Sequence, residues 1–101
     1  MVAIIIMEND EFSWLDEKAE RNRNKHGITF DRAMLAIRDA FAMEGIDDRQ
    51  DYGEERVNLV GMSDGVLLHV TYTERDGRIH IISARRAERH EQDNDYRENS
   101  T

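Results

Sequence analysis

Arginines gather near the C-terminal end of this chain, where an apolar run leads into a basic one. Residues 81–84 are apolar or small, and Arg85, Arg86 and Arg89 follow within five residues. We expect a helix to begin at Ser83, which puts Arg85 and Arg89, four residues apart, on one helical face. Two guanidinium groups on one face are suited to holding a phosphate or a carboxylate through paired hydrogen bonds. This segment is the first candidate for a binding or catalytic site.

Two further places carry side chains that can move protons. Lys25 and His26 precede Gly27 at the end of a run that favours a helix. A histidine there is either a solvated cation, favoured by the negative end of the helix dipole, or a proton donor or acceptor. Glu55, next to Arg56, is interpreted either as an ion-pair partner or as a general base. The sequence alone leaves both pairs of alternatives open.

Metal and cofactor sites are not indicated. The chain has no cysteine, and none of its histidines has the spacing of a known metal-ligand motif. His69 and His80 are interpreted as neighbours across paired strands. There is no Walker loop, dinucleotide fingerprint or nucleophile elbow. We therefore predict no metal and no cofactor.

The charge is distributed unevenly. The formal net charge is −8, which argues against nucleic-acid binding because Lys and Arg drive that binding. Residues 39–55 hold seven acids and one base, whereas residues 74–90 hold five arginines and three acids. The arginines are either paired with nearby acids at the surface or assembled as a phosphate clamp. Direct DNA binding is a minor further alternative, because the chain has no evident helix-turn-helix or basic arm.

The length and the apolar runs suggest one domain in the cytoplasm. A chain of 101 residues is expected to form a single domain, here an extension over residues 1–10, a folded part over residues 11–97 and a tail over residues 98–101. The longest apolar run, residues 2–7, is too short to span a membrane and lacks the features of a signal peptide. We expect no membrane association.

The elements that must position these side chains can be outlined from periodicity and turn signals. Helices are predicted over residues 16–26, closed by Gly27, and from a Thr29 cap to about residue 39. Strands are predicted over residues 41–46, 56–62, 66–73 and 78–83, with Asp-Gly turns before the third and fourth, and a final helix over residues 83–97. The expected class is α+β, with two N-terminal helices, an antiparallel meander of three to four strands and a C-terminal helix.

An ordered series of short motifs resembles the BrnT family of ribonuclease toxins. The series extends over about residues 12–91. Its members are Phe12, Trp14, Lys18, Asn22, Lys25-His26-Gly27, Phe30, Gly53-Glu54-Glu55-Arg56, Gly61, Ser63, Tyr72-Thr73, Arg75 and the run from Ile81 to Ala87. No one motif is diagnostic, but their order and spacing together are specific.

The resemblance implies a fold, an activity and a partner. The fold is RelE-like, with helices packed against an antiparallel sheet, and the activity is RNA cleavage by the toxin of a type II toxin–antitoxin pair. The partner is a BrnA-like antitoxin protein that neutralises the toxin in a heterotetramer, and DNA is contacted only through the antitoxin. Carried onto this chain, the active surface comprises Lys25, His26, Arg75, Arg85 and Arg89.

For such a nuclease we expect cleavage without a metal. The ribose 2′-hydroxyl attacks the adjacent phosphorus, and Arg85 and Arg89 hold the nonbridging oxygens. His26 is the candidate acid or base, and Glu55 is a second candidate base. The remaining basic residues are expected to add positive potential or to bind RNA: Lys25, Arg56, Arg75, Arg78 and Arg86.

A second function class stays open. The chain is alternatively a non-catalytic binding module that docks an acidic partner protein through its arginine face. Its net acidity favours this alternative, whereas His26 together with the arginines favours the nuclease. An antitoxin is expected to cover that face with carboxylates or to add a strand to the edge of the sheet.

Overall fold

The chain folds around one mixed β-sheet. The computed structural model describes residues 6–8 and 11–93, with side chains from residue 11 onward. The elements of this part are β1 (Ile6–Glu8), β2 (Phe12–Leu15), α1 (Asp16–His26), α2 (Phe30–Ile37), β3 (Met43–Asp47), β4 (Arg56–Ser63), β5 (Val66–Arg75) and β6 (Arg78–Arg86). The strand order is β1-β2-β6-β5-β4-β3, with β2 parallel to β6 and the other neighbours antiparallel. The α+β class is confirmed.

Both helices begin and end where local chemistry indicates. The predicted helix over residues 16–26 is confirmed as α1, and Gly27 closes it with a φ of 71°, its N–H donating to the Arg23 carbonyl at 2.8 Å. Such a left-handed conformation is easiest for glycine. Thr29 caps α2 as predicted, because its hydroxyl accepts from the Arg32 N–H at 3.3 Å. Neither helix in the described part of the chain is long and apolar enough to cross a membrane.

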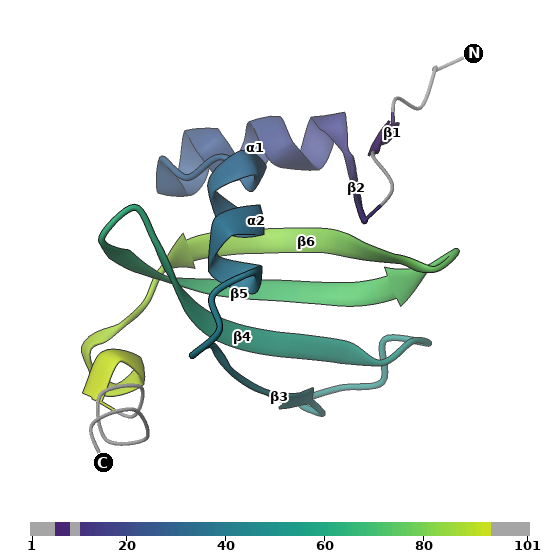
Figure 1. Cartoon of the computed structure of the whole chain (residues 1–101). Helices are drawn as coiled ribbons and strands as arrows, with labels where there is room; N and C mark the ends of the chain where they lie inside the picture. The colour runs from purple at the N-terminus through teal and green to yellow at the C-terminus, as the bar shows by residue number, and fades with distance from the viewer. Residues whose placement is uncertain (1–5, 9–10, 94–101) are drawn as a thin grey trace.

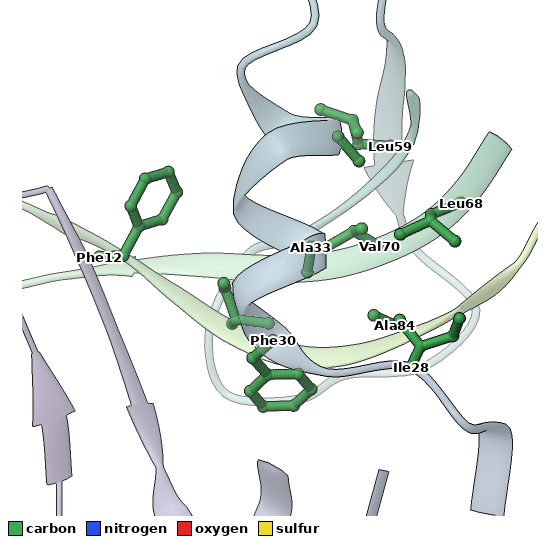
Figure 2. Close-up of a cluster of buried hydrophobic side chains, with 10 residues drawn as sticks. Phe12, Ile28, Phe30, Ala33, Leu59, Leu68, Val70 and Ala84 are labelled. Carbon is green, nitrogen blue, oxygen red and sulfur yellow. The ribbon is translucent and has the colours of Figure 1, made fainter. Parts of the chain in front are cut away.

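The core lies between α2 and one face of the sheet (Figure 2). Phe30, Ala33 and Ala36 of α2 are buried against Leu59 of β4 and its neighbours. The small alanines bring the helix close to the strands. A Cβ atom at Gly61 would collide with the carbonyl oxygen of Ala36, so this glycine permits the close approach. α2 does not cover the opposite face of the sheet.

α1 lies beside the sheet rather than over it. Figure 1 shows it running alongside β6, on the side where β2 pairs only with residues 79–80 of that strand. Beyond the end of β2, the buried amide of Asn22 provides hydrogen bonds to the edge of β6. It donates to the Ala84 carbonyl at 2.7 Å and accepts from the Ala84 N–H at 3.0 Å. It also donates to the Ile28 carbonyl at 2.9 Å. One side chain thus fixes α1 against the edge of β6.

The strands agree broadly with the predictions, apart from two additions and one shift. The turn residues before β5 and β6 have positive φ, as Asp-Gly hairpins require: Asp64 at 47°, Gly65 at 80°, Asp76 at 52° and Gly77 at 75°. The strand predicted over residues 41–46 is Met43–Asp47. β2 was not predicted, and residues 6–8 of the expected extension form β1, which pairs with β2. Residues 2–5 lie outside the described part.

The prediction that a helix begins at Ser83 is wrong. β6 continues to Arg86, paired with β5 through Leu68, and helical structure begins only at residue 89. Pairing with β5 satisfies the backbone groups of this segment, so the long-range ladder prevails over local helical propensity. Arg85 and Arg89 therefore lie on different elements, not on one helical face. The predicted end of this helix, near residue 97, lies outside the described residues.

Candidate functional site

The sheet face opposite α2 carries a row of polar side chains. Asn58, Thr71 and Ser83 lie side by side on β4, β5 and β6. Leu59, Val70 and Ala84, one neighbour of each along the strands, point the other way into the core, since side chains alternate along a strand. The Thr71 hydroxyl donates to the Asn58 amide oxygen at 2.7 Å. This row is called here the polar floor, and Thr71 at its centre is buried.

α1 borders that floor with cations. A pocket of about 240 Å³, called here the α1 pocket, lies between α1 and β6. It is lined by Lys18, Arg21, Asn22, Lys25, His26, Ile82 and Ser83. The four residues from Lys18 to Lys25 recur at intervals of three and four, which places them on one face of the helix. The lining holds three permanent cations and no carboxylate, in a chain with a net charge of −8.

The cations of the α1 pocket differ in how they are neutralised. Arg21 forms an exposed ion pair with Glu17 at 2.6 Å. For Lys18 and Lys25, no carboxylate of residues 11–93 lies within ion-pair distance. Within residues 11–93, these two lysines are therefore the cations of the pocket that an anion can meet without displacing a carboxylate.

The β6 strand is irregular at this place. The β5–β6 register shifts between Thr71 and Tyr72, so Thr71 pairs with Ser83 and Tyr72 pairs with Ile81. Ile82 is the extra residue of this bulge. Bulges commonly redirect side chains beside functional sites. Here the bulge separates the core residue Ile81 from Ser83, which lines the α1 pocket.

Arg85 follows two residues after Ser83, on the same face. Its terminal nitrogens donate to both oxygens of Glu91, at 2.8 and 3.1 Å, and one of them also donates to the Arg86 carbonyl at 3.1 Å. A guanidinium has five N–H donors. The fork formed by Nε–H and the remaining Nη2–H has no partner among residues 11–93, and the side chain is 31% exposed. Glu91 thus orients Arg85 while leaving one bidentate edge open.

Glu91 also lies beside a histidine. Its carboxylate is 3.6 Å from Nε2 of His69, which is the cross-strand neighbour of Arg85. Burial opposes ionisation of Glu91, but hydrogen bonds from Arg85 and from the Glu88 N–H outweigh it and hold the Glu91 pKa below its ordinary value. Burial, assisted by the Arg85 charge, lowers the pKa of His69. The imidazole is therefore neutral at physiological pH.

The other end of the sheet holds a second basic cluster, and it is neutralised. Arg75 donates to both oxygens of Glu54, the shortest contact being 2.9 Å, and this hydrogen bonding lowers the Glu54 pKa. Arg56 lies 3.7 Å from the same carboxylate and stacks over Tyr52 at 4.1 Å. The ion-pair partner at this end is Glu54. Glu55, which was expected in that role, is exposed, and its backbone carbonyl accepts from the Thr73 hydroxyl.

The expected convergence of all the arginines is wrong. Arg75 and Arg78 face each other across the β5–β6 hairpin, while Arg85 lies seven residues further along β6. At the usual rise this is about 23 Å, too far for both ends to act on one phosphate. Arg86 and Arg89 are exposed near the Arg85 end, and Arg86 points to the α2 side because it pairs with the core residue Leu68.

Sequence reasoning missed part of this site. Lys18 and Asn22 belong to the motif series, yet no role was predicted for either one. Ser83 was interpreted as a helix cap, and His69 only as a cross-strand neighbour. The neighbour of His69 is Arg85, and no signal within either strand indicates that register. Only the pairing of β5 with β6 brings the two side chains together.

Comparison with known families gives one match. A family model described as "Ribonuclease toxin, BrnT, of type II toxin-antitoxin system" matches residues 14–91. The matched residues include α1, the lining of the α1 pocket, both ends of the β5–β6 hairpin and Glu91. A comparison with curated proteins finds no match.

Proposed function

Because the chain belongs to the BrnT family of ribonuclease toxins of type II toxin–antitoxin systems, we propose that it cleaves RNA at the α1 pocket and the adjoining end of β6. Family membership implies an RNA target and an antitoxin protein as partner. The observation that carries the location is the presence of Lys18 and Lys25 in this pocket, neither with a carboxylate at ion-pair distance in residues 11–93 of an acidic chain. Binding to a phosphate backbone depends on such charge.

The proposed reaction uses a nucleophile that RNA itself supplies. The ribose 2′-oxygen attacks the adjacent phosphorus, the bond from phosphorus to the 5′-oxygen breaks, and a 2′,3′-cyclic phosphate and a 5′-hydroxyl result. The enzyme must stabilise the extra negative charge on phosphorus, remove the 2′ proton and protonate the leaving oxygen. None of these three tasks requires a metal ion, so the proposed mechanism has none.

Arg85 is the proposed phosphate ligand. Its open Nε–H and Nη2–H fork matches the spacing of two phosphate oxygens, and the Glu91 carboxylate keeps the guanidinium from rotating away. Lys25 contributes charge from the other side of Ser83. His26, which lines the same pocket, is the proposed acid that protonates the leaving 5′-oxygen.

Glu55, Arg56, Arg75 and Arg78 lie outside this proposed reacting centre. They stay at the hairpin end of the sheet, where Glu54 compensates much of their charge. Arg86 and Arg89 border the reacting end and are exposed, so they are proposed as contacts to RNA beyond the cleaved bond.

The fold and the partner follow the family in this proposal. Two helices that precede the antiparallel run β3 to β6 support a RelE-like arrangement. A BrnA-like antitoxin, in a heterotetramer, is proposed to neutralise the toxin. Carboxylates of such a partner would compete with RNA for the α1 pocket.

The test is RNA cleavage by the purified protein, free of its partner, in EDTA. We expect products that end in a 2′,3′-cyclic phosphate, and no cleavage where the RNA carries a 2′-deoxy substitution at the cut site. A requirement for added divalent metal, or cleavage of the 2′-deoxy substrate, would contradict the mechanism. Lys25→Gln should weaken both binding and cleavage if the α1 pocket is the site.

One observation favours a non-catalytic binding module instead. Arg75 and Arg85 are each bound to a carboxylate of this chain, as in a surface held together by ion pairs. Under that alternative, RNA stays intact at high protein concentration while an acidic partner protein still binds. The cleavage assay above separates the two functions directly.

A further inference from the structure

We propose that His69 is the catalytic base of this site, with Glu91 placed beside it and Arg85 to stabilise the imidazolium that forms. This inference rests on the proposed RNA cleavage and adds the residue that removes the 2′ proton. It concerns a histidine in the middle of β5, on the polar face, which shares one carboxylate with the proposed phosphate ligand.

The geometry places a base next to a phosphate ligand. His69 and Arg85 are directly opposite on β5 and β6, where side chains on one face are about 5 Å apart at Cβ. A phosphate held on the open fork of Arg85 therefore lies near the imidazole. His69 and Glu91 each keep 14% of the side chain exposed, so the pair is sheltered but open to the polar face.

The charges around His69 suit a base. Three charged groups face it: Arg85 from β6, Glu91 from the C-terminal segment and Arg49 from the loop after β3. Burial and the two arginines lower the pKa of His69, whereas Glu91 raises it. The resting imidazole is neutral and can accept a proton, and the imidazolium formed during the reaction gains an ion-pair partner 3.6 Å away.

The proton and bond changes balance. Nε2 of His69 takes the proton of the 2′-hydroxyl as the 2′-oxygen bonds to phosphorus. The bond between phosphorus and the 5′-oxygen breaks, and the 5′-oxygen takes a proton from His26. His69 then returns its proton to solvent, and His26 regains one, so no other reactant is consumed.

The decisive variant is His69→Gln, with His90→Gln as the matched control. His90 is 72% exposed, and its one ion-pair partner among residues 11–93 is Glu88, at 3.7 Å, so its loss should leave cleavage unchanged. A general base contributes on the order of 10²–10⁴-fold, and His69→Gln should lower kcat by that factor. Binding of RNA blocked by a 2′-O-methyl group at the cut site should be unchanged, and far-ultraviolet circular dichroism should report the native fold.

Glu91→Gln tests the positioning role through the pH profile. The rate requires neutral His69, so kcat/KM rises with pH through the His69 pKa, on the acid side of its ordinary value of 6.5. Removing the Glu91 charge lowers that pKa further. The rising limb should move to lower pH while the maximum rate falls. A purely structural role for Glu91 would lower the rate without moving the limb.

The outcomes separate this inference from the proposed function. If His69→Gln cleaves RNA as fast as the unaltered protein, His69 is not the base and the RNA-cleavage proposal still stands. If the unaltered protein binds RNA but never cleaves it, both proposals fail. Loss of blocked-RNA binding in His69→Gln would show that the residue supports binding rather than proton transfer, and would also overturn the assignment.

Discussion

At each end of the β5–β6 hairpin an arginine is held by a carboxylate, but the cations that lie beside these two pairs differ. At the turn, Glu54 accepts from Arg75 and also lies close to Arg56. At the other end, Arg85 keeps one fork open, and the lysines of the α1 pocket have no carboxylate beside them in residues 11–93. The comparison teaches that the number of arginines does not locate a phosphate site. What matters is whether the cations beside each arginine have a carboxylate of their own.

The difference arises from where the acids fall along the chain. Residues 39–55 are strongly acidic, and their last turn lies against the β5–β6 hairpin, where it provides Glu54. α1 places its acids mainly in the first turn, at Asp16 and Glu17, and its bases in the last. This distribution of charges interacts favourably with the helix dipole, and it makes the C-terminal end of α1, which lies near Arg85, basic.

The sharpest contrast is between Arg85→Ala and Arg75→Ala. Removing one donor to a developing oxyanion typically costs about 10²–10³-fold in kcat, which is the loss we expect for Arg85→Ala. Arg75→Ala should change kcat little, because Arg75 lies opposite Arg78, seven residues of β6 away from Arg85. Steady-state RNA cleavage with both variants measures the ratio. Equal losses would mean that the two ends act together, contrary to the separation along β6.

Asn22→Ala should destabilise the protein, because it removes the hydrogen bonds that fix α1 against β6. The variant leaves the N–H and the carbonyl of Ala84 and the carbonyl of Ile28 without their partner. Each buried polar group left unsatisfied costs about 1–3 kcal/mol, so we expect the free energy of unfolding to fall by about 3 kcal/mol. Urea denaturation measures it, and the exposed Asn24, two residues further along α1, provides the control as Asn24→Ala. A loss as large in Asn24→Ala would exclude this explanation.

Local signals were enough to predict α1, α2 and the hairpin turns. Gly27, Thr29 and the two Asp-Gly pairs act within a few residues, so their effect can be read along the chain. The position of Arg85 could not be predicted in this way. Its segment has helical propensity, but a ladder with a strand more than ten residues earlier keeps it extended.

The candidate site was predictable only in its parts. Lys25, His26 and Arg85 were selected from the sequence, and the structure brings them to one end of the sheet. Arg75 was selected with them and lies at the other end, where the Asp-Gly turn already placed it opposite the start of β6. The sequence could not show that Lys25 and His26 lie at the far end of that strand. Asn22 shows the same limit: its partner Ala84 is 62 residues away.

A smaller effect should appear in the salt dependence of RNA binding. Each phosphate neutralised on a single strand contributes about 0.7 to the slope of log K against log salt concentration. Lys25→Gln should reduce the slope by about that amount, because its ammonium has no carboxylate partner to lose in residues 11–93. Arg75→Gln should leave the slope unchanged, since Glu54 already balances the charge. Binding of 2′-O-methyl RNA at several salt concentrations measures both slopes, and an equal reduction would remove the distinction between the ends.

The smallest expected difference is in acid stability, and it compares the two carboxylates. The folded-state pKa of Glu54 and of Glu91 lies below the ordinary 4.5, so each contributes stability above about pH 4.5 that is lost as the pH falls through the folded value. Glu91 accepts hydrogen bonds from the Glu88 N–H as well as from Arg85, and these hold its pKa low although burial opposes its ionisation. Glu91→Gln should therefore flatten the acid limb of stability against pH more than Glu54→Gln does. Urea midpoints between pH 3 and pH 7 measure the two acid limbs. A flatter limb in Glu54→Gln than in Glu91→Gln would show that Glu54, at the hairpin end, contributes more pH-dependent stability than Glu91, and would contradict this prediction.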